Sequence, residues 1–359
     1  MPIKYIGSKR RLVGDIMRVV RASGATTALD GFTGTTRVAQ AMKQDGIYVT
    51  ASDMASYSKM FADCYIATDA DAIDEADVRQ AIDRLMALPG KDGYFTETFC
   101  RKSRFVQPKN GMRIDAIRDA IESDYAGTPL YPILLTSLIE AADRVDSTTG
   151  VQMAYLKRWS PRSYNDLEMR VPNLLRGTGA SIQGDIFNVL RDIPYQGLIY
   201  FDPPYNQHNY FGNYHIWETL VRWDHPDFYG VACKRSDVRD RSMKSVFNSK
   251  RTAPDAIRRM IAMAHDKCDC LVLSYNDESW ISSQDMTQAV SDSGFESVLQ
   301  LAFDYERYVG ARIGIYSTDG TKVGHVDHTK NHEYMFVGAD KATASRIAKA
   351  TSDAIVTRI

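Results

Sequence analysis

Short apolar runs alternate with amphipathic segments along the chain. Runs rich in β-branched, aromatic and aliphatic residues predict buried strands at 27–30, 47–51, 198–201, 271–274 and 334–337. Helical periodicity predicts helices over about 9–21, 36–44, 57–66 and 254–264. This alternation of strand and helix is typical of a parallel, doubly wound α/β sheet whose two faces are both covered.

The stretch 69–179 breaks this alternation. Its patterns, such as those at 111–118 and 131–142, are helical, and few convincing strands occur in it. The sequence therefore predicts a sheet domain formed by residues 1–68 and 180–359, interrupted by an inserted helical subdomain of residues 69–179.

Composition places the chain among ordinary globular proteins. Its 359 residues are 44% hydrophobic and 25% charged, which allows a sizeable core and excludes disordered, collagen-like and disulfide-stapled classes. No apolar run reaches the ~18 residues of a membrane-spanning helix, and the first residues lack the apolar centre of a signal peptide. The five cysteines are an odd and sparse set. Together these features favour a cytoplasmic protein with reduced thiols and no membrane association.

Charge is balanced overall but segregated along the chain. The 44 Lys and Arg residues against 45 Asp and Glu residues give a net charge of −1, so the whole chain does not attract polyanions. Residues 101–118, however, hold six bases and one acid, and residues 234–259 hold nine bases and three acids. Either run alone is typical of a solvated helix face. Two such runs flanking the motif described next favour a phosphate-contacting surface.

The sharpest motif is Asp202-Pro203-Pro204-Tyr205, which directly follows the predicted strand at 198–201. Such a strand end is where α/β sheets bind ligands. The two prolines remove backbone donors, so the segment presents only acceptors beside an aromatic ring. It suits a planar substrate with an exocyclic amine: Asp202 and the Pro203 carbonyl each accept one N–H, and Tyr205 stacks on the ring. The alternative is a proline-punctuated strand end with a buried tyrosine.

A second motif joins a strand to a helix through the glycine-bearing turn that includes Asp30, Phe32 and Gly34. Glycine lets the backbone approach a ligand closely, and the helix start offers free N–H groups, although the spacing is not a dinucleotide fingerprint. Asp53 follows Asp30 by 23 residues, at the end of the next predicted strand. A carboxylate there can bind both hydroxyls of a ribose. Taken by itself, Asp53 fits a helix N-cap equally well.

Two weaker motifs complete the set. Tyr5 and Lys9 flank a Gly-Ser turn ahead of a predicted helix, where they could clamp a small ligand; alone, the segment is typical of a helix cap. Asp185 and Ile186 follow a short strand, and Asp185 lies 17 residues before Asp202. They could bind an amine and flank a flat ring, or form a simple turn.

Taken together, the four motifs resemble those of the S-adenosylmethionine-dependent DNA adenine-N6 methyltransferases, the Dam-like and type II restriction-modification class. The resemblance covers nearly the full length and includes the segments 110–118, 209–219 and 273–276. It implies a Rossmann-like methyltransferase sheet, S-adenosyl-L-methionine as cofactor, double-stranded DNA as partner and no metal. The implied activity is that of a site-specific DNA-methyltransferase (adenine-specific). A cognate restriction endonuclease that acts separately would be a further partner.

The resemblance also assigns roles to residues. Its catalytic positions are Asp202, Pro203, Pro204 and Tyr205, which would hold a target base flipped out of the duplex. Its cofactor positions are Tyr5, Lys9, Asp30, Phe32, Gly34, Asp53, Met54, Asp185, Ile186 and Asp202. Among these, Asp53 would bind the ribose hydroxyls with Met54 against the cofactor adenine, and Asp185 and Ile186 would contact the amine and the face of that adenine.

We expect the basic runs to contact DNA, mostly at phosphates. The insertion supplies Arg101, Lys102, Arg104, Lys109 and Arg113. The region after the catalytic motif supplies Lys234, Arg235, Arg239, Arg241, Lys244, Lys250 and Arg251.

Three other functions remain open. Adenine in RNA and the amide of a protein glutamine are alternative methyl acceptors; relatives acting on glutamine tend to carry Asn, and cytosine-N4 enzymes Ser, where Asp202 stands. The third is a catalytically silent DNA-binding subunit with the same fold.

His325, His328 and His332 have a spacing that hints at a metal, but no cysteine or clustered carboxylate accompanies them. We therefore expect loop histidines and no metal site.

Overall fold

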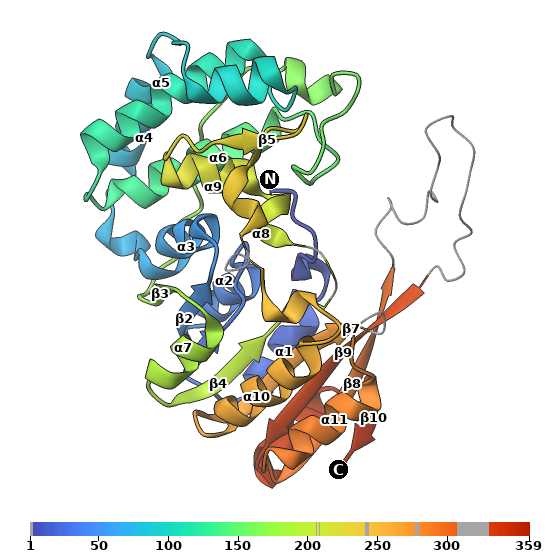
Figure 1. The fold of residues 1–359 in the computed structure, drawn as a ribbon. Coiled ribbons are helices and arrows are strands. Elements are labelled where there is room, and N and C mark those ends of the chain that lie inside the picture. The colour runs from blue at the N-terminus through green and yellow to red at the C-terminus, as the bar shows by residue number, and fades with distance from the viewer. Residues whose placement is uncertain (1–2, 206, 208, 241–243, 277–279, 307–329) are drawn as a thin grey trace. The chain divides into compact units, whose positions relative to one another are not determined.

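The chain divides into two compact units (Figure 1). A computed structural model describes residues 3–205, 207, 209–240, 244–276, 280–306 and 330–359. The first unit comprises Met1–Met17, Thr26–Asp192 and His208–Ser245, and the second comprises Arg18–Ala25, Ile193–Gln207 and Val246–Ile359.

Three parallel strands organise the first unit. They are β1 (Thr27–Asp30), β2 (Tyr48–Asp53) and β3 (Ala180–Gln183), with β2 in the middle. The register places Asp30 opposite Ala51 and Asp53 opposite Gln183, so the carboxyl ends of the strands meet at one edge. The interior positions of β1 and β2 are buried, as their apolar composition requires.

Helices precede and follow these strands. They are η1 (Lys9–Arg11), α1 (Val13–Ser23), α2 (Arg37–Gln44), α3 (Ser56–Ala62), the π-helix η2 (Asp63–Ala67) and α7 (Ile186–Asp192). After the second unit's first segment, the chain returns to form α8 (Tyr210–Asn213), α9 (His215–Arg222), a hairpin of β5 (Phe228–Tyr229) and β6 (Lys234–Arg235), and η6 (Ser236–Arg239).

Residues 68–179, all of them described, contain helices and no strand. The helices are η3 (Ala70–Ala72), α4 (Glu75–Met86), the π-helix η4 (Thr96–Lys102), α5 (Pro108–Tyr125), α6 (Leu130–Arg144) and η5 (Pro161–Tyr164). Figure 1 shows α4, α5 and α6 packed together. Asp74 begins α4 by accepting the Ala76 N–H at 2.8 Å, and apolar residues at 78, 81, 82 and 85 face the interior. That residues 69–179 form a separate subdomain with these boundaries stays a prediction.

A buried arginine ties this helical region to α9. Arg118 is 1% exposed, and its guanidinium donates to the carbonyls of Leu220 and Val221 at 2.6 and 3.1 Å. It also pairs with Glu122 at 2.8 Å. The last carbonyls of a helix lack intrahelical partners, so Arg118 caps the C-terminus of α9.

The second unit holds a mixed sheet in the order β10-β8-β9-β7-β4. Its strands are β4 (Gln196–Phe201), β7 (Cys268–Asn276), β8 (Ser297–Glu306), β9 (Lys330–Ala339) and β10 (Ile355–Arg358). Its helices are η8 (Val246–Asn248), α10 (Ala253–His265), α11 (Ser283–Asp292) and α13 (Lys341–Ala350). β4 and β7 are parallel, whereas β9 runs antiparallel to β7 and β8, and β10 antiparallel to β8.

The predicted α/β fold is confirmed, and each of the five predicted strands lies within or overlaps an observed one. The antiparallel pairing at one edge of the second unit differs from the all-parallel expectation. β8 carries Gln300 and Ser297 among its apolar residues, and β10 has only four residues, which weakens the apolar-run signal for both. No helix in the described ranges is long and apolar enough to cross a membrane.

Candidate active site

The glycine turn after β1 is a tight structure held by short hydrogen bonds. Thr33 donates its hydroxyl to Asp30 at 3.0 Å and its N–H to the carbonyl of Ser52 at 3.0 Å. Gly34 has a φ of +49°, a conformation that favours glycine. A Cβ on Gly34 would lie 3.1 Å from Cε1 of Tyr5. The turn and the N-terminal motif, separate in sequence, therefore lie in contact.

Asp53 ends β2 with its carboxylate turned toward this glycine turn. Its Oδ2 accepts the N–H of Gly34 at 2.9 Å, and its Oδ1 accepts the N–H of Ala55 at 3.0 Å. Burial raises the pKa of Asp53, while the N–H donors of Ala55 and Gly34 act against that rise. Asp53 thus binds the N–H of Gly34 and that of Ala55, and because Ala55 is the N-cap residue of α3 and no side chain caps that helix, the N-cap alternative for Asp53 is wrong.

An aromatic cluster fixes the ring of Tyr5. Tyr5 stacks on Tyr214 with 4.6 Å between ring centroids, Tyr214 stacks on Trp217 at 4.6 Å, and Tyr57 meets them edge-on. The hydroxyl of Tyr214 accepts the N–H of Ile6 at 2.6 Å. Tyr5 is therefore held between this cluster and the glycine turn. Sequence reasoning missed the supporting role of Tyr214 and Trp217, which only their place in the segment 209–219 could have suggested.

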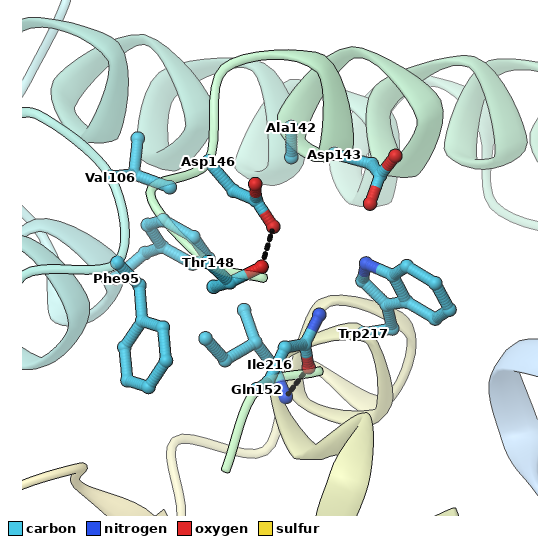
Figure 2. Close-up of a pocket in the computed structure, with 10 residues that line it drawn as sticks. Phe95, Val106, Ala142, Asp143, Asp146, Thr148, Gln152, Ile216 and Trp217 are labelled. Carbon is cyan, nitrogen blue, oxygen red and sulfur yellow. Dashed lines mark hydrogen bonds between the residues drawn. The ribbon is translucent and has the colours of Figure 1, made fainter. Parts of the chain in front are cut away.

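Lys4, the residue before Tyr5, is anchored by two buried carboxylates at the end of α6. Its ammonium donates to the Asp143 carbonyl at 2.5 Å and pairs with Asp143 and Asp146 at 3.2 and 3.1 Å. Burial raises the pKa of Asp143 to about 6, with Lys4 opposing and Asp146 adding to the rise. Figure 2 shows these carboxylates and Thr148 facing Trp217 of α9 across a small pocket. Sequence reasoning did not find this anchor.

The end of β3 joins Asp53 and Met54. The amide of Gln183 donates to the carbonyl of Met54 at 3.1 Å, and the N–H of Gly184 donates to the carbonyl of Asp53 at 3.0 Å. Asp185 accepts the N–H of Phe187 at 2.9 Å and so begins α7. The following Ile186 and the earlier Lys9 are buried, whereas Met54 is exposed and Phe32 is half-buried. Most of the sequence-predicted residues of the first unit thus follow the ends of adjacent strands, whereas Tyr5 and Lys9 precede β1 and Tyr5 lies against Gly34.

The catalytic motif belongs to the second unit. It follows β4, whose last residue, Phe201, pairs with Leu273 of the parallel strand β7. Asp202, Pro204 and Tyr205 are half-buried, and Pro203 is buried. The Tyr205 ring meets the Tyr275 ring edge-on at 5.9 Å. The strand end, the acceptor-only segment and an aromatic wall therefore occur together within this unit.

The predicted DNA-contacting residues of the insertion have partners in the protein. Arg101 pairs with Asp92 at 2.6 Å, Lys102 lies 3.7 Å from Glu97, and Lys109 pairs with Asp166 at 2.7 Å. Arg104 donates to the Lys157 carbonyl with its guanidinium over the Trp159 ring, and the half-buried Arg113 donates to the Met86 carbonyl. Their role in DNA binding stays a prediction.

The basic residues after the catalytic motif are of two kinds. Lys244, Lys250 and Arg251 are exposed, as DNA contacts require, while Arg241 lies outside the described residues. The prediction that Arg235 contacts DNA is wrong. Arg235 is 1% exposed, because its guanidinium is engaged by Asp224 and Asp237 inside the protein.

No set of three or more His, Cys, Asp or Glu side chains within the described ranges is arranged to hold a metal ion. His325, His328 and the side chain of His332 fall outside those ranges. All five cysteines are free and buried.

The fold, a largely parallel central sheet with helices, is of the Rossmann-like methyltransferase type. A family model described as "D12 class N6 adenine-specific DNA methyltransferase" matches residues 5–289, and the chain belongs to this family.

Three curated relatives agree with that membership. The chain is 29% identical over 326 residues to the modification methylase StsI of Streptococcus sanguinis, covering 85% of this chain and 49% of the relative. It is 27% identical over 321 residues to the type II methyltransferase M.NlaIII of Neisseria lactamica, covering 85% and 92%. It is 24% identical over 327 residues to M.FokI of Planomicrobium okeanokoites, covering 85% and 50%. The chain thus spans about half the length of StsI and M.FokI.

Proposed function

We propose that this chain is a site-specific DNA methyltransferase that transfers the methyl group of S-adenosyl-L-methionine to N6 of an adenine flipped out of double-stranded DNA. The observation that carries the proposal is the segment 202–205, which lacks backbone donors at Pro203 and Pro204, at the carboxyl end of β4 beside Tyr275 in a chain of this family. The names of the relatives further support a place in a restriction-modification system. That a cognate endonuclease acts separately is part of the proposal.

The residues of the first unit fit S-adenosyl-L-methionine. Because Gly34 has no side chain, its backbone lies directly against the Tyr5 ring, which leaves a surface of backbone and aromatic ring for the methionine end. The Asp53 carboxylate already accepts the N–H of Gly34 on one oxygen and that of Ala55 on the other, and the ribose hydroxyls would bind at further lone pairs of these two oxygens. The proposed cofactor set is Tyr5, Lys9, Asp30, Phe32, Gly34, Asp53, Met54, Asp185, Ile186 and Asp202.

Catalysis then rests on the segment 202–205. When bound, S-adenosylmethionine supplies a methyl group on a positively charged sulfur, which is already activated for transfer. The N6 lone pair of adenine is delocalised into its ring and is a poor nucleophile. Asp202 and the Pro203 carbonyl would each accept one N6 hydrogen, which favours a pyramidal nitrogen as positive charge develops there. The proton that the methylated nitrogen then loses would pass to the Asp202 carboxylate or to water. Pro204 keeps the backbone free of competing donors, and Tyr205 would stack on the base.

DNA binding would use exposed and half-buried cations. Arg101, Lys102, Arg104, Lys109 and Arg113 come from the helical region, and Lys244, Lys250 and Arg251 follow the catalytic motif. Most would neutralise phosphates, and a minority would read base edges. We place the reaction in the cytoplasm, because five free, buried thiols are typical of a reducing compartment.

The test is incorporation of labelled methyl groups from S-adenosylmethionine into plasmid DNA. Asp202→Asn keeps the side-chain shape but removes the charge, and we expect a loss of at least ~10²-fold, the scale of one preorganised electrostatic group. The matched control is Asp266→Asn, an exposed carboxylate on the turn after α10, which should retain full activity. Undiminished methylation by Asp202→Asn would refute the mechanism.

The same assay separates the alternatives. Labelling of RNA or protein in place of DNA would assign another acceptor to the site. Absence of all labelling together with no calorimetric binding of S-adenosylmethionine would identify a silent DNA-binding subunit. Digestion of the product to nucleosides should give N6-methyladenosine in the deoxy form, and N4-methylcytosine in its place would overturn the choice of base.

A further inference from the structure

The β5–β6 hairpin of the first unit is a rigidly mounted element. Its strands pair Phe228 with Arg235 and Tyr229 with Lys234. At its base, the buried Arg235 donates to both oxygens of Asp224, each at 2.7 Å, and to Asp237 at 2.7 Å. Asp224 precedes the hairpin and Asp237 follows it, so one guanidinium holds both ends of the element.

The tip of this hairpin presents one apolar side chain to solvent. The chain turns between Gly230 and Cys233, whose N–H donates to the Gly230 carbonyl at 3.0 Å. Val231 at the tip is 81% exposed, more than any other large apolar side chain in the described part of the protein. Ala232 and Cys233 beside it are buried. The exposed valine is therefore a single projection on a fixed support.

Three cations contact the strands of this hairpin or belong to them. The Arg239 guanidinium lies 3.7 Å above the Tyr229 ring, and the Lys234 ammonium lies 3.3 Å from the sulfur of the exposed Met153. The Lys102 ammonium lies 5.1 Å above the ring of Phe228. We call Lys102, Met153, Tyr229, Val231, Lys234 and Arg239 the hairpin surface. Glu97, 3.7 Å from Lys102, offsets part of one positive charge.

The hairpin surface joins two segments that are far apart in sequence. Lys102 ends the π-helix η4 in the helical region, whereas Lys234 and Arg239 follow the catalytic motif. The hydroxyl of Tyr94 also donates to the Pro226 carbonyl at 2.6 Å, which fixes the helical region to the start of the hairpin. The two basic runs of the sequence therefore meet at this hairpin, where Lys102, Lys234 and Arg239 are cations and Asp227 and Asp240 are exposed acids of the same segment.

We propose that the hairpin surface binds duplex DNA and that Val231 is a wedge that enters a base step. The cations suit the phosphates that border a groove, and an apolar side chain on a rigid mount suits partial unstacking of neighbouring base pairs. This inference rests on the proposed function. It adds that the protein weakens the stack before an adenine is extruded, and that Val231 contributes to this step.

The test compares two substrates, made after mapping the methylated site in DNA from cells that express the protein. One is a fully paired duplex, and in the other the target adenine lies opposite an abasic position, so its extrusion requires less unstacking. We expect Val231→Ala to transfer methyl groups about tenfold more slowly to the paired duplex, and Val231→Asp at least a hundredfold. Both should lose less than threefold on the abasic duplex.

Val356→Asp is the matched control, because Val356 is 55% exposed on β10 of the second unit and belongs to no site described above. It should act as the wild type does on both substrates. Equal losses of Val231→Asp on the two duplexes, or no loss on either, would overturn the wedge.

A binding measurement separates this proposal from the proposed function. The double variant Lys234→Gln, Arg239→Gln should bind the paired duplex more weakly, and its plot of log affinity against log salt should be flatter by about 1.8, or ~0.9 for each lost phosphate contact. Unchanged affinity and slope would exclude the hairpin surface from the DNA interface, whether or not methyl transfer occurs. If the wild type transfers no methyl group to any DNA, the proposed function fails, and this binding experiment still decides the hairpin proposal.

Discussion

Substitution of Gly34 by alanine tests the contact between the glycine turn and the N-terminal motif. Alanine at a φ of +49° costs about 1 kcal/mol through the backbone alone. Its Cβ would also lie 3.1 Å from the Tyr5 ring, which cannot retreat freely because Tyr214 is stacked behind it. If the turn moves instead, the Gly34 N–H leaves the Asp53 carboxylate, and a hydrogen bond to a charged group contributes about 1.5 to 3 kcal/mol.

Gly34→Ala should therefore lower the free energy of unfolding by about 3 kcal/mol, measured by urea denaturation without cofactor. The control is Gly46→Ala, which has a φ of +84° but no atom within 4 Å of the added Cβ. It should lose only the backbone contribution, about 1 kcal/mol. Calorimetry should also show at least tenfold weaker binding of S-adenosylmethionine by Gly34→Ala and not by Gly46→Ala. Equal destabilisation of the two variants, with wild-type cofactor affinity in both, would refute the reasoning.

Three other substitutions test features of the first unit. Arg235→Met should lower the free energy of unfolding by about 3 kcal/mol in urea, because it leaves Asp224 and Asp237 without their shared partner. Burial lowers the pKa of His215 to about 3, so the stability that neutral His215 contributes is present above pH 6.5 and falls toward pH 3. The free energy of unfolding should therefore decrease by ~2 kcal/mol between pH 6.5 and 5. His215→Gln should not show this decrease. Lys4→Met should weaken S-adenosylmethionine binding about tenfold in calorimetry, since Tyr5 loses its anchor at Asp143. Wild-type behaviour in any of these measurements would contradict the corresponding contact.

The strand ends that carry the proposed chemistry could be predicted because apolar runs and their polar termini are local signals. The predicted strand at 27–30 has the observed bounds, and Asp53 ends β2 as expected. The antiparallel partners of β7 could not be predicted from such runs. Pairing direction depends on connections and on neighbouring strands, and the apolar run at 334–337 is compatible with either direction.

Basic residues show the limit of reasoning from charge. Arg235 and Arg118 both lie in predicted nucleic-acid-binding runs, yet each is 1% exposed and holds the protein together. The carbonyl that binds Arg118 lies far away in the sequence, and the acid that binds Arg235 has nothing in its own sequence context to mark it as a buried partner. The local pattern therefore cannot distinguish these two arginines from Lys250. Lys4 was missed for the same reason, because its carboxylates lie 139 and 142 residues away.

The cap that Arg118 places on α9 limits how modular this enzyme class can be. A chimera that exchanges residues 69–179 for those of a relative removes Arg118, whose guanidinium reaches the carbonyls of Leu220 and Val221. Such a graft has to bring an arginine at the equivalent place on the incoming helix, or the donor's own version of residues 215–223. Residues 69–179 and 215–223 should therefore be exchanged together, rather than the insertion alone.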